Sequence, residues 1–147
     1  MSDTTHQKRK RHNYDDLQQL KDILKSKKWI EFQISEKRAK LISDIKSIHP
    51  TRLYYMYIEA ENEFIQTHTL LVNARSNKST HLLDQYQETY WKAFIAKNNA
   101  SSKYYKAKIK KYELKKYLTQ TEIDLDVATI DVALAQEELD WFTLNHF

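Results

Sequence analysis

The stretch that decides the fold is residues 119–147, which read TQTEIDLDVATIDVALAQEELDWFTLNHF. Apolar side chains recur there at alternating intervals of three and four residues, the heptad spacing of packed helices: Leu125, Ala128, Val132, Ala135, Leu139 and Phe142. A second, adjacent stripe comprises Ile123, Val127, Ile130, Leu134 and Trp141. A helix that is apolar over so much of its circumference is typically buried, so we expect other helices to cover it on at least two sides.

Charge divides this stretch from the one before it. Residues 119–147 contain seven Asp and Glu and no Lys or Arg, whereas residues 97–118 contain eight Lys and one Glu. The acidic block can neutralise its basic neighbour. We therefore expect the two segments to pack against each other as antiparallel helices at the centre of the fold. Exposed ion pairs between them would set the register rather than supply much stability.

The composition favours long helices. The chain of 147 residues has no Gly, one Pro and no Cys. Without Gly the chain lacks the usual residue for tight turns and for helix ends that need a positive φ. The simplest architecture is a few long helices joined by Asn, Ser and Thr. The absence of Cys excludes disulfides and thiolate metal sites.

The first part of the sequence, residues 1–50, predicts a tail followed by one long helix. Residues 1–12 are polar and suited to a disordered basic tail. A helix should follow from Tyr14 to Ile48, with a break or a change of partner near Ser26-Lys27-Lys28, because charged residues interrupt its apolar stripe. Pro50 should then begin the next helix, since Pro suits a first helical turn.

The second half predicts three further segments. A helix should span Thr51 to Ala74 and a loop Asn73 to Thr80. Asn98 to Ser102 is either a loop or a polar patch within one helix that reaches Leu118. Thr119 to Glu122 matches a capping box, which predicts a new helix there. Alternating apolar residues in 123–134 leave a strand as an alternative, although no partner strand is evident.

The fold class expected from these segments is all-α. We predict four to five helices in an elongated, antiparallel, coiled-coil-like bundle. Residues 13–147 should form a single helical domain behind the tail. No apolar run approaches the roughly 20 residues that a membrane-spanning helix needs.

The sequence predicts no enzyme. Phosphate-binding loops and nucleophile elbows need Gly, and the chain has none. Its six His form no metal-binding pair of the His-Glu-x-x-His or Glu-x-x-His type. We accordingly expect no catalytic residues, no metal, no cofactor and no small-molecule substrate.

A basic cluster, Lys8-Arg9-Lys10-Arg11, ends the predicted tail. Such a run suits the acidic groove of a nuclear import receptor, and it equally suits nucleic-acid phosphates. A solubilising tail is the alternative.

A second basic region alternates with aromatic residues. Lysines can neutralise phosphates while rings stack on bases, which makes candidates of Lys103, Tyr104, Lys106, Lys110 and Lys111. The lysines do not share one helix face, however, and Lys lacks the bidentate fork of Arg. We favour the alternative in which the Tyr rings are packed and the Lys residues flank the acidic helix.

Aromatic residues are abundant, with 10 Tyr, 5 Phe and 3 Trp. Aromatics are enriched where proteins meet, although Tyr can also lie at an ordinary solvent boundary. The residues expected to contact a partner helix are Leu125, Val132, Leu139, Trp141, Phe142, Tyr54 and Tyr57.

The functional hypothesis is a non-enzymatic helical scaffold or adaptor in a multi-subunit assembly, intracellular and nuclear. Its partners would be other helical proteins or a second copy of itself. The alternative is a nucleic-acid-associated protein, such as a chromatin factor or a viral structural protein. It would contact phosphates through the basic tail and residues 103–117.

Overall fold

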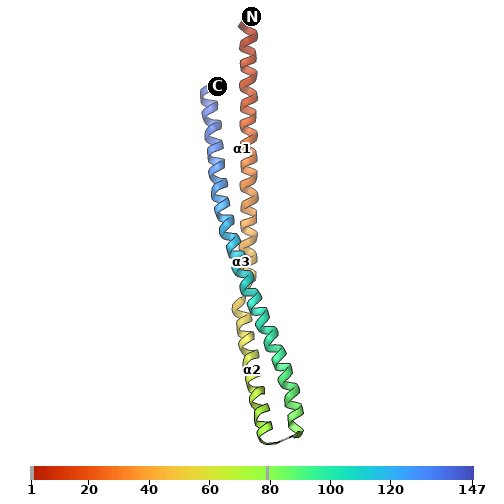
Figure 1. Cartoon of the computed structure of the whole chain (residues 1–147). Helices are drawn as coiled ribbons and strands as arrows, with labels where there is room; N and C mark the ends of the chain where they lie inside the picture. Colours follow the sequence, from red (N-terminus) through yellow and green to blue (C-terminus); the bar gives the residue numbers. More distant parts are fainter. Residues whose placement is uncertain (1, 79) are drawn as a thin grey trace. The chain divides into compact units, whose positions relative to one another are not determined.

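Three helices make up the part of the chain that the structure describes (Figure 1). The computed structural model describes the backbone of residues 2–78 and 80–147 and the side chains of residues 11–78 and 81–147. Its elements are α1 (Ser2–Ser47), α2 (Pro50–Ser76) and α3 (Thr80–His146), with no strand in these backbone ranges. The all-α prediction is confirmed. The predicted count of four to five helices is wrong, and so is the strand alternative for 123–134.

The predicted count is wrong because α3 continues through two sequence motifs that are typical of helix ends. Asn98 and Asn99 are exposed and Ala100 faces inward, so the polar patch lies within one helix. Thr119, expected to cap a new helix, donates its hydroxyl hydrogen bond to the Lys115 carbonyl 3.1 Å away, as a Thr inside a helix does. Nothing between residues 80 and 147 forces a break, since this range has neither Gly nor Pro.

One heptad register runs through α3. Every inward position is buried or half-buried, and the intervals alternate between three and four residues throughout. The positions are Leu83, Tyr86, Tyr90, Ala93, Lys97, Ala100, Tyr104, Ala107, Lys111, Leu114, Leu118, Thr121, Leu125, Ala128, Val132, Ala135, Leu139 and Phe142.

α1 is also longer and less interrupted than predicted. It begins at Ser2, so residues 2–12 are helical where a disordered tail was expected. No break occurs near residues 26–28. Lys27, Glu31 and Arg38 occupy heptad positions and are half-buried. Long charged side chains tolerate such positions because their aliphatic stems pack while their charged ends reach water.

The connections follow the expected chemistry. α1 ends before His49, and Pro50 is the first residue of α2, as predicted. α2 runs to Ser76, two residues past its predicted end, and Asn77-Lys78 form a turn. Lys78 has a φ of 53°, the left-handed conformation that Gly adopts most easily. Ser79 lies outside the described residues.

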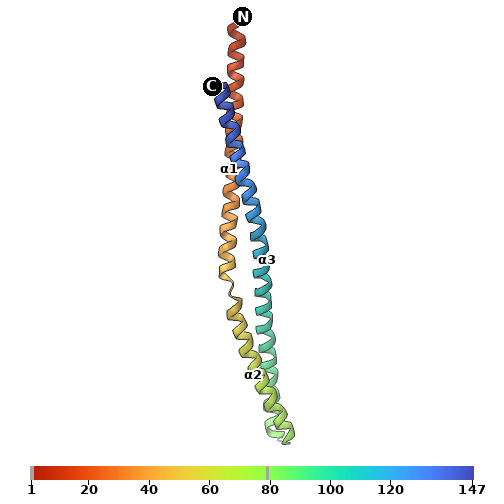
Figure 2. The same cartoon turned by 90° about the vertical axis from the view of Figure 1, so that its left-hand side faces the viewer.

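The chain divides into two compact units. Unit 1 combines α1 up to Ser43 with the part of α3 from Lys115 onward, and unit 2 comprises residues 44–114. Figure 1 shows the α1 and α3 segments of unit 1 side by side. Figure 2 shows α2 beside the first part of α3 in unit 2. Each unit is thus a pair of antiparallel helices.

A two-helix pair buries little. The accessible surface is 11670 Å², whereas a compact protein of 17.7 kDa exposes about 7900 Å². Among the residues with described side chains, only six apolar ones are buried, namely Leu24, Leu71, Ala74, Ala93, Ala128 and Ala135. No helix of the described chain is long and apolar enough to cross a membrane.

Candidate protein-interaction surface

The inner face of unit 1 joins α1 to α3. The Tyr14 and Phe147 rings lie 5.2 Å apart between centroids, and Arg38 lies 3.4 Å from Glu122. From Tyr14 to Arg38 is 24 residues along α1, and from Phe147 to Glu122 is 25 residues along α3. The two antiparallel helices therefore stay in the same register between these contacts. Small inward residues, Thr121, Ala128 and Ala135, are among the most buried in the unit.

Four predicted interface residues belong to this inner face. Leu125, Val132, Leu139 and Phe142 are half-buried at heptad positions of α3. Their partner helix is α1 of the same chain. They are therefore occupied within unit 1.

The charge pairing differs from the prediction. Residues 97–118 and 119–147 are successive parts of α3, so they are not antiparallel partners. The acidic end of α3 pairs with α1 instead. Residues 1–43 carry eleven Lys and Arg against six Asp and Glu, and residues 115–147 carry two Lys against seven Asp and Glu.

The opposite face of the acidic segment is bare. We call it the outer stripe, and its six apolar residues are exposed by 52% at Ile123 to 84% at Leu144. They are Ile123, Val127, Ile130, Leu134, Trp141 and Leu144. They also follow heptad spacing, interrupted by Glu137. The prediction of cover on two sides is thus wrong within this chain, since α1 covers one side.

Acidic residues border the outer stripe on both sides. Helical periodicity places Asp124, Asp131 and Glu138 along one border and Asp126 and Asp140 along the other. An apolar line between two charged borders is the pattern of a coiled-coil seam. The surface therefore resembles a seam that lacks its partner helix.

In unit 2, aromatic rings fill the space between α2 and α3. The Tyr57 and Tyr104 rings are stacked with centroids 6.3 Å apart, and the Tyr54 ring lies 5.4 Å from Tyr104. Phe64 similarly packs 5.2 Å from Tyr90. Tyr54 and Tyr57, predicted to contact a partner helix, thus contact α3 of their own chain. Tyr104 is likewise engaged, so its ring is not free to stack on a base.

The predicted basic contacts are scattered. Lys103, Lys106 and Lys110 are exposed, whereas Lys111 is half-buried at an inward heptad position. Arg11 is exposed, and the side chains of Lys8, Arg9 and Lys10 lie outside the described residues.

A second exposed stripe accompanies these lysines. We call it the basic stripe and define it by its exposed apolar residues on α3, Trp91, Ile95, Tyr105, Ile109 and Tyr112. They recur at alternating intervals of four and three residues, with Asn98 and Ser102 at the intervening positions. Sequence periodicity alone did not predict this stripe, because Asn98–Ser102 could equally have been a loop that interrupts the helix. Lys106, Lys108 and Lys115 border it.

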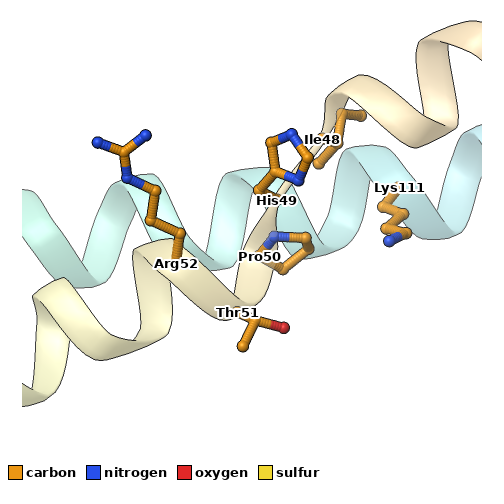
Figure 3. A pocket seen from close by; sticks show the side chains of 6 residues that line it. All are labelled: Ile48, His49, Pro50, Thr51, Arg52 and Lys111. Atoms are coloured by element: carbon orange, nitrogen blue, oxygen red, sulfur yellow. The ribbon is translucent and has the colours of Figure 1, made fainter.

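A hollow lies at the connection between α1 and α2. Ile48, His49, Pro50, Thr51, Arg52 and Lys111 line it. Figure 3 shows the Arg52 and Lys111 side chains pointing away from each other, so their charges do not converge on one ligand. Within the described residues no group of His, Asp and Glu could hold a metal ion.

Comparison with protein-family models, curated proteins and solved structures finds no match to this chain. Among the surface features of the described residues, the outer stripe is the one with the clearest physical meaning.

Proposed function

We propose that this protein is a non-enzymatic helical scaffold that binds another helix along the outer stripe of α3. The exposure of six heptad-spaced apolar residues, flanked by carboxylates, is the observation that carries the proposal. Exposed apolar surface of this kind marks interaction sites in proteins. A partner helix would bury it by the same seam geometry that joins α1 to α3.

Trp141 supports this reading. Its side chain is 63% exposed, and Trp29 and Trp91 are exposed by 58% each. In all, eleven of the eighteen aromatic rings are exposed, each of them in the described part of the chain. Large aromatic residues that become buried at an interface are the ones that contribute most to affinity. Trp141 is therefore the expected anchor of the outer stripe.

We propose further that the scaffold works in a nuclear multi-subunit assembly. Lys8 to Arg11 would bind the import receptor. Replacing all four by Ala in a fluorescent fusion should abolish nuclear accumulation. Replacing Lys103, Lys106, Lys108 and Lys110 removes the same charge and should leave accumulation intact, which separates the motif from net charge.

The scaffold role is tested by a matched pair of variants. Ile130→Asp with Leu134→Asp places two charges on the outer stripe. Thr129→Asp with Thr143→Asp adds the same charge at exposed positions outside the stripe and its borders. Affinity purification with quantitative mass spectrometry should recover the same partners for the wild type and the control. The stripe variant should lose them at unchanged helicity, and a stripe variant that keeps the full set would refute the proposal.

A nucleic-acid role is the second candidate. Tyr105 and Tyr112 are exposed among exposed lysines, so their rings could stack on bases. The absence of Arg from residues 97–118 argues against base-specific reading. Oligonucleotide affinity that falls steeply with salt, and that survives deletion of residues 1–12, would favour this candidate.

A further inference from the structure

We infer that the occupant of the outer stripe is a second copy of this chain, which supplies its basic stripe. This inference rests on the scaffold role proposed above and names the partner. The outer stripe presents apolar side chains between carboxylates, and the basic stripe presents apolar side chains between lysines. The two stripes are thus alike in their apolar residues and opposite in the charge of the residues beside them.

Charge complementarity is the first argument. Residues 119–147 hold seven Asp and Glu and no Lys or Arg, and residues 97–118 hold eight Lys and one Glu. Two copies aligned outer stripe to outer stripe would bring carboxylates together, and two basic stripes would repel in the same way. Pairing of unlike stripes can instead place carboxylates opposite lysines along one border, whereas the other border sets Asp126 opposite Glu113 in the register given below. Charged borders of this kind help to select the partner in coiled coils.

The apolar residues agree with this pairing. In an antiparallel register that sets Ile130 against Ile109 of the other copy, Leu134 faces Tyr105 and Val127 faces Tyr112. Within this register, intervals of three and four residues match on both helices, and Leu144 faces Ile95, whereas Trp141 faces Asn98 and Ile123 faces Lys116. The same spacing brings Asp131 opposite Lys108 and Asp124 opposite Lys115.

The proposed stoichiometry is a dimer. Each copy carries one outer stripe and one basic stripe, so two copies can satisfy both stripes reciprocally as a closed dimer. The exposed face of α1 is a poorer partner. Its Trp29 and Phe32 rings already stack on each other, 5.6 Å apart, and residues 1–43 include six Asp and Glu among their Lys and Arg.

Charge reversal gives a sharp test with the full-length chain. An acid-reversed variant carries Asp124→Lys and Asp131→Lys. A base-reversed variant carries Lys108→Glu and Lys115→Glu. Lys108, Lys115 and Asp124 are exposed and Asp131 is half-buried, so the helix pairs inside each chain should persist. Circular dichroism checks helicity, and the Thr129→Asp with Thr143→Asp variant serves as a control.

Sedimentation velocity at low salt should show a dimer for the wild type and the control. Each reversed variant alone should dissociate at least tenfold more readily, because like charges then border both stripes. Their equimolar mixture should restore the dimer as a heterodimer. Rescue on mixing would support the inference in a way that a merely unfolded variant could not produce.

Three results would overturn the inference. These are a wild type that stays monomeric at 200 µM, a base-reversed variant that self-associates normally, and a mixture that stays monomeric. Binding of an oligonucleotide by a monomeric wild type, lost on base reversal, would assign the lysines to nucleic acid instead. The scaffold proposal fails separately, when the outer-stripe variant keeps every partner of the wild type in affinity purification.

Discussion

The guanidinium of Arg38 lies 3.4 Å from the carboxylate of Glu122, and this contact joins α1 to α3 within unit 1. Among the residues with described side chains, no other ion pair connects two helices. Both side chains remain well exposed, so water screens their attraction. The contact marks the register of the pair, and apolar packing supplies most of its stability.

The interaction between Arg38 and Glu122 should therefore contribute little to the free energy of unfolding. We predict that a double-mutant cycle with Arg38→Ala and Glu122→Ala gives a coupling free energy below about 1 kcal/mol, and that salt reduces it further. Urea unfolding of the wild type, both single variants and the double variant provides the four values needed. A coupling well above this range at 0.5 M salt would mean that the pair is a main source of stability.

Close packing at the small inward residues should matter more. Ala128 is 5% exposed, so Ala128→Leu must push α1 and α3 apart and should cost about 1–3 kcal/mol. Ala133→Leu places the same side chain on the exposed face of the same helix and should change stability by no more than about 0.5 kcal/mol. Equal effects in urea unfolding would contradict the assigned inner face.

The turn before α3 contains a strained residue. Lys78 adopts a φ of 53°, which costs an L-residue more than it costs Gly. Lys78→Gly should therefore raise the free energy of unfolding by about 0.5–1 kcal/mol, after allowing for the greater entropy of Gly in the unfolded chain. Asn77 has a φ of −87°, so Asn77→Gly should give no such gain. Thermal unfolding of both variants distinguishes the two positions.

Tyr57 should make stability fall at high pH. Its partial burial, and then the negative charge of Glu61, raise the pKa of Tyr57 above the ordinary value of 10.0. A raised pKa means that the folded state favours the neutral hydroxyl. This contribution is complete below pH 10 and is lost as pH rises through the folded pKa. Tyr57→Phe should therefore flatten the decline in unfolding free energy above pH 10, as measured by urea unfolding over a pH series.

Periodicity predicted the helical class and much of the inner face. Leu125 to Phe142 on α3 occupy the heptad positions read from the sequence, and Pro50 begins α2 as expected. These features depend on spacing and on the fixed φ of Pro, which are local properties. The sequence is a reliable guide to them because no distant contact has to be known.

Helix ends and partners were not predictable in the same way. The Thr119–Glu122 motif caps a helix only when the preceding helix stops, and packing of Thr121 in the continuous register keeps it going. The acidic segment pairs with α1 because chain connectivity brings α1 to it. The local pattern of charges does not reveal which helix becomes the neighbour. Likewise, the two stripes visible on residues 119–147 looked equally buried, and only the structure shows which one α1 covers.

The two faces of α3 can be compared directly by thiol labelling, since the chain has no other Cys. Single variants Ala128→Cys and Ile130→Cys place a thiol on the inner face and on the outer stripe. We predict slow labelling of the first at every protein concentration. The second should label rapidly at nanomolar concentration and become protected as concentration rises into the micromolar range. Rapid labelling of Ile130→Cys at all concentrations, with purified partners recovered from cells also giving no protection, would contradict the claim that the outer stripe is an interface.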